Sequence, residues 1–153
     1  MGKVLRIHKI KNGTVIDHIA GGEAVNVLKI LGITGREGAV ISVAMNASSR
    51  RLGRKDIVKI EGRELRPNEV DKIALIAPEA TINIVRNYGV VQKKPVTLPE
   101  SIVNIVRCRN PACITNSKEP VKPVFRVVRK APILLRCDFC ETSLSYDEVT
   151  DQF

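Results

Sequence analysis

The sequence contains few aromatic residues and no tryptophan. Two tyrosines and three phenylalanines are its only aromatic residues among 153, and none of them precedes Tyr88. Proteins that read single-stranded RNA stack its bases on aromatic side chains. Residues 1–87, which carry most of the basic charge, therefore lack the means for such recognition, and phosphate contacts alone would give unspecific binding. We expect no nucleic-acid partner.

Long hydrophobic runs are also missing. No stretch approaches the roughly 18 consecutive apolar residues that a membrane-spanning helix needs. Residues 3–10 alternate polar and apolar side chains, and no apolar core of a secretory signal follows them. We expect a cytoplasmic protein without membrane contact, in a compartment where clustered cysteines hold a metal more often than they form disulfides.

Histidine is scarce as well, which bears on catalysis. The two histidines, His8 and His18, lie far in sequence from all four cysteines. A catalytic cysteine needs a neighbouring base, most often histidine. The sequence offers no nucleophile–base pair and no open metal site, so we do not expect an enzyme.

The cysteines form two short pairs in the last third of the chain. Cys108 and Cys113 belong to CRNPAC, and Cys137 and Cys140 belong to CDFC, 23 residues further on. Each pair makes a turn that aims two sulfurs at one point, and four thiolates complete the tetrahedral shell of Zn²⁺. We therefore predict one structural zinc ion with no open position. A redox dithiol in CDFC or four unpaired buried thiols are the competing interpretations.

Prolines divide the chain into two parts. Pro95 and Pro99 restrict the backbone in a stretch without helical or strand periodicity. We place the boundary between residues 95 and 101, which gives domains of residues 1–97 and 98–153. The net charge of +9 is divided unequally, with +8 in residues 1–98 and +1 in residues 99–153. The basic surface belongs to the part without cysteines.

The first part is predicted to be α+β. Helical spacing and turn signals indicate helices at residues 22–32 and 67–77. Runs of β-branched residues indicate strands at residues 14–19, 39–45, 56–62 and 81–87, with an edge strand at 88–93. The order βαββαβ is that of the ferredoxin-like fold, in which two helices cover one face of an antiparallel sheet. The other face must tolerate solvent or meet a partner.

The second part is predicted to be a small all-β zinc domain. Short strands are indicated at residues 124–130, 133–137 and 143–146, with no helix of useful length. About 55 residues bury too little apolar surface for stability on their own, so the metal is expected to stabilise this part.

A basic segment at residues 48–66 leaves two interpretations open. Seven of its nineteen residues are Arg or Lys, but acidic residues are interleaved. Composition alone favours a solvated, salt-bridged surface. A small anionic ligand is the alternative, and periodicity by itself identifies no ligand.

Four segments in this order and spacing carry a family resemblance. They are NGTVIDHI (12–19), NASSRRLGRKDIVKIEGREL (46–65), APEATINIVRNYGVVQKK (77–94) and CRNPACITN…CDFC (108–140). Together they resemble the regulatory chain of aspartate carbamoyltransferase over about residues 4–147. The combination of GTVIDHI with GRKD and KIE is specific, whereas the cysteine spacing alone would not be.

The resemblance implies a non-catalytic chain that controls pyrimidine biosynthesis. Members of this family form dimers through the N-terminal domain and dock on catalytic trimers through the zinc domain. Their N-terminal domain binds nucleotides, with CTP typically inhibitory and ATP competing for the same site. This chain is accordingly expected to form a self-dimer, to bind CTP and ATP, and to assemble with the catalytic chain.

The resemblance also implies the residues of the effector site. Asp17 corresponds to a ribose contact, and His18, Lys59 and Lys93 correspond to partners of the triphosphate and ribose. Asn83 and Tyr88 resemble residues that line the base and triphosphate pocket. The apolar and backbone surface of that pocket would come from Ile10, Val15 and Val90, and Lys55 is a further candidate. A triphosphate carries about four negative charges, so several cations are needed to hold it.

One departure and one rival remain. Arg109 follows the first cysteine where members of the family often have proline, which makes this turn more basic. The rival from another class is a zinc-ribbon, RNA-associated translation factor, which also joins a small α/β domain to a zinc ribbon. Such a ribbon would need to be basic, and this one is near neutral.

Overall fold

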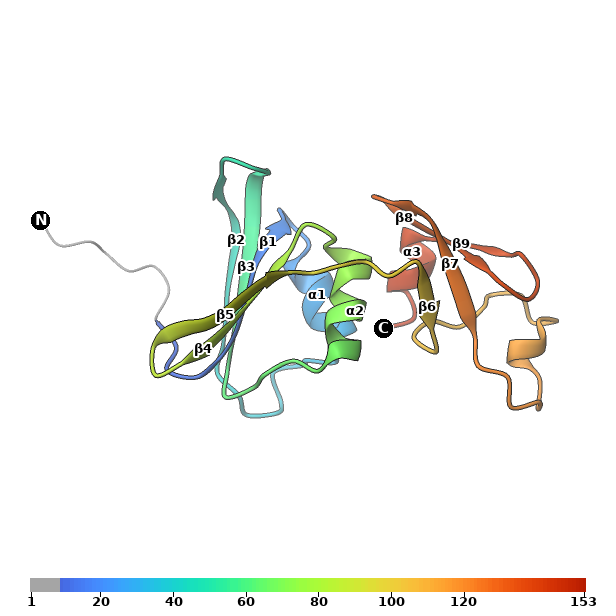
Figure 1. Ribbon diagram of the computed structural model, residues 1–153, viewed down its shortest axis with the longest axis horizontal. Helices are drawn as coiled ribbons and strands as arrows, with labels where there is room; N and C mark the ends of the chain where they lie inside the picture. The colour runs from blue at the N-terminus through green and yellow to red at the C-terminus, as the bar shows by residue number, and fades with distance from the viewer. Residues whose placement is uncertain (1–8) are drawn as a thin grey trace, which may run out of the picture.

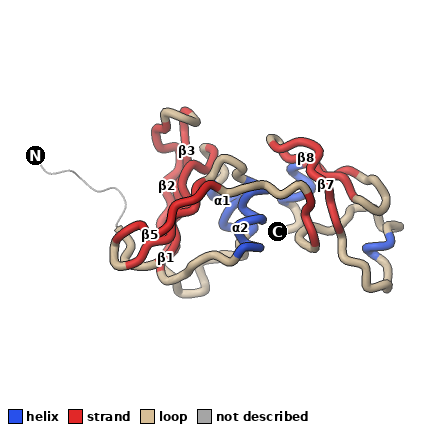
Figure 2. Tube along the Cα trace, viewed as in Figure 1, coloured by secondary structure: helices blue, strands red, loops and turns tan. Residues whose placement is uncertain are grey.

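A computed structural model describes residues 9–153, in two β-sheet units joined by a short linker (Figures 1 and 2). We call β1–β5 with α1 and α2 the N-terminal unit, and β6–β9 with η1 and α3 the C-terminal unit. Residues 3–8 of the alternating stretch lie outside the described residues. The elements of the N-terminal unit are β1 (Gly13–Ala20), α1 (Ala24–Ile30), β2 (Ile41–Ser49), β3 (Gly53–Glu61), α2 (Pro67–Ile76), β4 (Thr81–Arg86) and β5 (Gly89–Pro95).

The N-terminal unit confirms the predicted ferredoxin-like arrangement. Its five strands are all antiparallel in the order β2-β3-β1-β4-β5. Both helices cover one face of this sheet, the face turned toward the C-terminal unit (Figure 1). Side chains alternate between the two faces of a strand, and Ile16, Val58 and Ile82 point to the helical face. They are buried against the helices, which explains why the helices pack on that face. The opposite face, which we call the open face, has no helix on it.

A β-bulge interrupts β1 at its most polar point. The register with β3 shifts between Ile16 and Ile19, and His18 has a φ of 58°. Strict alternation would turn His18 toward the helices, whereas the extra residue lets Ile16 and Ile19 both reach the core. The two consecutive polar residues Asp17 and His18 are thereby kept out of the core.

The buried carboxylate of Asp56 braces this bulge. Asp56 pairs with Ile19 across the strands and is fully buried. One of its oxygens accepts the N–H groups of Gly22 and Ala24, both at 2.9 Å, and the other accepts the N–H of Asn46 at 2.8 Å. It therefore joins β3 to the first turn of α1 and to a second bulge, in β2.

The C-terminal unit is a four-stranded antiparallel sheet in the order β6-β7-β8-β9. Its core is formed by large side chains, with Phe125, Leu135 and Leu144 fully buried. The elements are β6 (Ser101–Val103), the 3₁₀ helix η1 (Ile114–Asn116), β7 (Val124–Lys130), β8 (Ile133–Cys137), β9 (Ser143–Ser145) and α3 (Tyr146–Thr150).

The prediction of residues 143–146 as one strand is corrected by the structure. β9 ends at Ser145, whose hydroxyl accepts the N–H of Glu148, while the Glu148 carboxylate accepts the N–H of Ser145. This capping box starts α3 at Tyr146. The sequence Ser-x-x-Glu carries the signal, but the five-residue helix is too short for helical periodicity to reveal it.

Two glycine-related boundaries also differ from the expectation. Gly13 begins β1, where an added Cβ would lie 2.1 Å from the carbonyl oxygen of Ile60. Only glycine fits at this position, because the backbone of β3 lies too close for a side chain. At the start of α1, the predicted helix 22–32 is shortened to residues 24–30, because Gly22 has a φ of 93° and lies outside the helix. Among residues 9–153, no helix is long and apolar enough to cross a membrane.

Replacing Asp56 with alanine is expected to destabilise the N-terminal unit by at least about 3 kcal/mol, because it leaves three backbone N–H groups without their acceptor. Asp71→Ala, on α2 and outside the core, is the matched control and should change the unfolding free energy by about 0.5 kcal/mol or less. Chemical denaturation followed by circular dichroism measures both. Equal stability of the two variants would contradict the bracing role of Asp56.

Candidate functional sites

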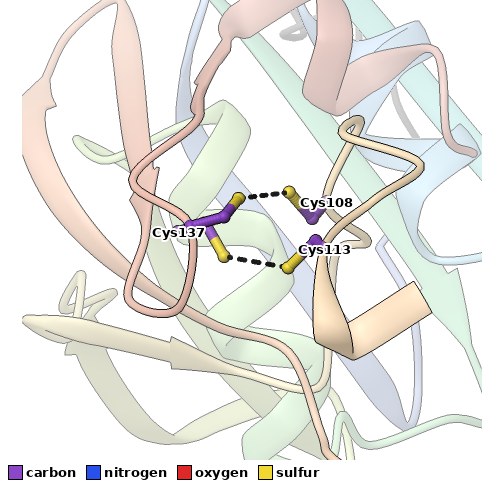
Figure 3. A group of neighbouring side chains, drawn as sticks. Cys108, Cys113 and Cys137 are labelled. Atoms are coloured by element: carbon purple, nitrogen blue, oxygen red, sulfur yellow. Dashed lines mark hydrogen bonds between the residues drawn. The ribbon is translucent and has the colours of Figure 1, made fainter. Parts of the chain in front are cut away.

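The first candidate site is a cluster of four thiols in the C-terminal unit. The Sγ atoms of Cys108, Cys113, Cys137 and Cys140 all lie within 4.8 Å of one another. Figure 3 shows Cys108 and Cys113 on one loop, turned toward Cys137 on the other. The first three are buried and Cys140 is half-buried. All four predicted metal ligands are thus brought together.

The spacing of the sulfurs fits a tetrahedral metal ion. Cys108 and Cys140 lie 3.5 Å apart, and Cys113 and Cys137 lie 3.7 Å apart, measured between their Sγ atoms. Four sulfurs at about 2.3 Å from a central Zn²⁺ would be about 3.8 Å from one another. A disulfide would need about 2.05 Å, so the thiols are unbridged. Their number and separation fit a closed structural site.

Local turns hold the two cysteine loops. The N–H of Cys113 donates to the carbonyl oxygen of Asn110 at 3.0 Å. The N–H of Glu141 donates to the carbonyl oxygen of Cys137 at 2.9 Å. The side chain of Asn116 donates to the carbonyls of Cys108 and Asn110, both at 2.8 Å. These hydrogen bonds hold the backbone of the two loops, and the loop backbone sets the direction of the cysteine side chains.

The thiols have unequal affinities for protons. Burial raises the pKa of Cys108 to about 12 and also raises that of Cys137. Hydrogen bonding to Thr142 lowers the pKa of Cys140 to about 6. Grouping four thiolates without a cation would thus be unfavourable, and a divalent ion supplies the charge that the cluster needs.

The second candidate site is a polar row across the open face. The strand register places Ser42, Lys59, Val15, Asn83 and Lys93 side by side, one from each of β2, β3, β1, β4 and β5. Because paired residues share a face of the sheet, all five point away from the helices. Asn83 also donates to the carbonyl of Val15 at 3.3 Å. Four predicted effector residues are therefore aligned by the register alone.

The bulge in β1 brings two more predicted residues to this face. Asp17 pairs with Thr81 of β4, and the His18 ring lies 3.0 Å from the Thr81 hydroxyl through Nδ1. Lys55 approaches Asp17 to 3.0 Å in an ion pair, with both side chains mostly buried. Lys55, expected only as a further candidate, thus belongs to the same cluster.

The remaining predicted residues lie at one end of the sheet, where β1 and β5 begin and β4 ends. Tyr88 is 63% exposed in the two-residue turn between β4 and β5, and its N–H bonds to the carbonyl of Lys11 at 2.9 Å. Val90 is exposed and pairs with Val85. Ile10 has a buried side chain, only 4% exposed, so the backbone is what it can offer a ligand.

A hollow of about 450 Å³ lies at this end and includes residues that were not predicted. Its walls are Lys9, Lys11, Asn12, Glu61, Gly62 and Tyr88. Lys9 and Lys11 were missed because they flank the buried Ile10 as ordinary alternating polar residues. The alternation of Lys9 and Lys11 around Ile10 indicates that both lysines face solvent. It does not reveal which end of the sheet they lie beside.

These features define a class: a two-part protein with an open, cation-bearing α+β sheet and a small β unit organised by four thiols. Family models agree with this division. Residues 5–97 match "Aspartate carbamoyltransferase regulatory chain, allosteric domain", and residues 100–150 match the metal binding domain of the same chain.

Curated relatives agree over nearly the full length. A chain named aspartate carbamoyltransferase regulatory chain from Hyperthermus butylicus is 59% identical, over 99% of this chain and 95% of the relative. One from Methanothrix thermoacetophila is 61% identical over 92% of each, and one from Thermofilum pendens is 57% identical over 99% and 96%. The chain belongs to the family of aspartate carbamoyltransferase regulatory chains.

Removing metal with a chelator is expected to unfold the C-terminal unit and leave the sheet of the N-terminal unit folded. Metal binding to four thiolates contributes roughly 10 kcal/mol or more, which exceeds what so small a core supplies. Hydrogen exchange should then lose protection in β6–β9 and keep it in β1–β4. Re-addition of Zn²⁺ is the control and should restore it. Unchanged protection in β7 and β8 after verified metal loss would contradict a structural role.

Proposed function

We propose that this chain is a non-catalytic regulatory subunit that binds a nucleoside triphosphate on its open face. Residues 1–97 form the effector-binding domain, and residues 98–153 form the zinc domain that contacts the catalytic chain. The observation that carries the proposal is the alignment of Lys59, Val15, Asn83 and Lys93 in one row, with Asp17 and His18 beside it. The row supplies two lysines and an amide, and Asp17 beside it supplies a carboxylate. All of them lie on a sheet face that no helix covers.

The row suits an extended anion with a polar sugar. Lys59 on β3 and Lys93 on β5 are three strand spacings apart, about 14 Å, which is more than a single phosphate spans. Between them, Asn83 offers an amide, and the Asp17 carboxylate can accept from ribose hydroxyls. Lys55 lies 3.0 Å from Asp17 and orients that carboxylate. Phosphates near the two lysines and a ribose near Asp17 would satisfy this chemistry.

The base would occupy the end of the sheet where β1 begins and β3 and β4 end. The hollow beside Tyr88 offers an aromatic face and backbone groups of the Ile10 segment, which can distinguish one base edge from another. CTP and ATP carry the same triphosphate and ribose, so both would require Lys59 and Lys93. The two nucleotides would accordingly exclude each other.

Exposed apolar side chains on both cysteine loops suggest where the zinc domain docks. Ile114 follows the first pair and is 47% exposed, and Phe139 lies within the second pair and is 48% exposed. Their positions depend on the loops that the metal would hold together. We propose that they contact the catalytic chain of aspartate carbamoyltransferase, because exposed aromatic residues at metal-fixed sites are efficient interface contacts.

The edge of the N-terminal sheet suggests how two copies of this chain pair. β2 is an outer strand, and Val40, Val43 and Met45 are exposed along it or next to it. An outer strand with unpaired backbone groups and apolar side chains favours pairing with another strand. A self-dimer through this edge would cover those side chains.

Replacing Lys59 with alanine is expected to weaken binding of CTP and of ATP by about 10- to 100-fold, the loss of one charge-assisted contact. Isothermal titration of the zinc-loaded chain measures both nucleotides and their mutual competition. Lys29→Ala is the matched control, since Lys29 is exposed on α1 and lies on the helical side of the sheet. Equal affinities for the two variants would remove Lys59 from the site.

Replacing Phe139 with aspartate is expected to weaken assembly with catalytic trimers by about 30-fold or more, because a buried aromatic contact is exchanged for a charge. Analytical ultracentrifugation of mixtures measures the assembly, and the chain alone should sediment as a dimer. Val25→Asp changes a comparably exposed residue of the N-terminal unit and should assemble normally. If the Phe139 variant assembles as well as the parent chain, its loop is not the docking surface.

A further inference from the structure

The short helix α3 contacts both units of the protein. It lies between the C-terminal sheet and the helices of the N-terminal unit (Figure 1). Val149 is fully buried, which fixes the inner face of the helix, whereas Tyr146 at its first position reaches toward α1. The helix is therefore placed to transfer a change in one unit to the other.

Glu148 of α3 and Gln152 just after this helix contact the two residues that flank Cys108. Nε of Arg109, next to Cys108, lies 2.9 Å from the Glu148 carboxylate and 2.9 Å from the carbonyl oxygen of Ser143. The side chain of Gln152 both accepts from the N–H of Arg107 and donates to its carbonyl, each at 2.7 Å. Arg107 and Arg109, which flank Cys108, thus both contact the C-terminal segment of residues 148–152.

The other end of α3 contacts the start of α1. The Tyr146 hydroxyl donates to the carboxylate of Glu23 and accepts from the amide of Asn26 at 3.0 Å. Asn26 also donates to Glu23 at 3.2 Å. Glu23 is the N-cap residue of α1. Burial and the neighbouring Glu23 raise the pKa of Tyr146 well above its ordinary value, so the hydroxyl remains a donor.

Apolar packing fills only part of the contact between the two units, which we call the seam. A cavity of about 320 Å³ lies between the units, lined mainly by apolar residues and bordered by Glu23 and Tyr146. Because part of the seam is unfilled, the relative position of α3 and α1 depends strongly on the directional contact.

The start of α1 is in turn tied to the bulge of the open face. The N–H groups on both sides of Glu23, those of Gly22 and Ala24, bond to the buried Asp56. Asp56 pairs with Ile19 directly after Asp17 and His18. One unbroken set of contacts therefore runs from the cysteine pair through α3 and Tyr146 to the first turn of α1 and the open face.

We propose that the Tyr146 hydroxyl links the metal centre to the first turn of α1, so that metal loading orders the effector-binding unit of the same chain. Cys108, Cys113, Cys137 and Cys140 would hold the metal ion, which would fix the first cysteine loop. Arg109 of this loop holds Glu148 of α3, Arg107 holds Gln152 just after α3, and Tyr146 holds Glu23. Tyr146 acts as a positioning residue and touches no ligand. Its consequence for nucleotide affinity rests on the function proposed above, whereas its effect on α1 does not.

The primary test is hydrogen exchange of residues 22–27 in the full-length chain. Tyr146→Phe removes only the hydroxyl, and in the zinc-loaded variant these amides should exchange about tenfold faster, as expected for the loss of a hydrogen bond to a charged group. Zinc removal from the parent chain unfolds the unit that carries Tyr146 and should produce at least this acceleration, and zinc removal from the variant should bring the rate to the same final value as in the parent. Asp147→Asn, on the exposed side of α3, is the control and should behave as the parent.

Glu23→Gln provides a second, independent variant. If the contact is the link, Tyr146→Phe and Glu23→Gln should accelerate exchange non-additively, because either one breaks the same pair. The proposal would be overturned if the exchange rates of residues 22–27 changed neither on loss of the hydroxyl nor on loss of the metal. Strictly additive effects of the two substitutions would also overturn it.

Nucleotide titration separates this proposal from the proposed function. In zinc-loaded protein, Tyr146→Phe should weaken CTP binding by the same factor as zinc removal does in the parent chain. A chain that shows the exchange effect but binds no CTP would support the link and refute the nucleotide site. A chain that binds CTP equally with and without zinc, with unchanged exchange, would refute the link alone.

Discussion

The carboxylate of Asp56 is buried beneath the bulge in β1 and accepts three backbone N–H groups from two different segments. A buried polar group is tolerated only when hydrogen bonds replace those it made to water, and here both carboxylate oxygens accept them. The bulge it braces keeps Asp17 and His18 out of the core, while the same hydrogen bonds fix the start of α1. The position of Asp17 and His18 beside the polar row and the position of the first turn of α1 at the contact between the units both depend on this one side chain.

The C-terminal unit depends on a different constraint. Its sheet is small, and its cysteine loops are held by local backbone turns, so four converging thiols need a cation to be stable together. A closed four-sulfur shell has no open position for substrate, which agrees with a regulatory chain. A bound metal ion would hold the two loops together, with Ile114 and Phe139 exposed on them.

Much of this could be predicted from the sequence, for identifiable reasons. Strands and helices of the N-terminal unit follow from strong periodicity, and the two cysteine pairs follow from spacing rules that few other arrangements satisfy. The bulge could not be placed in advance, although two adjacent polar residues between Ile16 and Ile19 cannot alternate properly. The roles of Lys9, Lys11 and Asp56 were also hidden, because they arise from contacts with residues that are distant in sequence. For Tyr146, the residue type gave no hint of a contact 123 positions away.

The proposed function places a nucleoside triphosphate across the open face of the N-terminal sheet. A crystal structure of the zinc-loaded chain with CTP would reveal where the nucleotide binds. We expect phosphates at Lys59 and Lys93, ribose near Asp17, and the base beside Tyr88. Nucleotide density at another surface, or an empty open face at a CTP concentration that saturates the chain in solution, would contradict it.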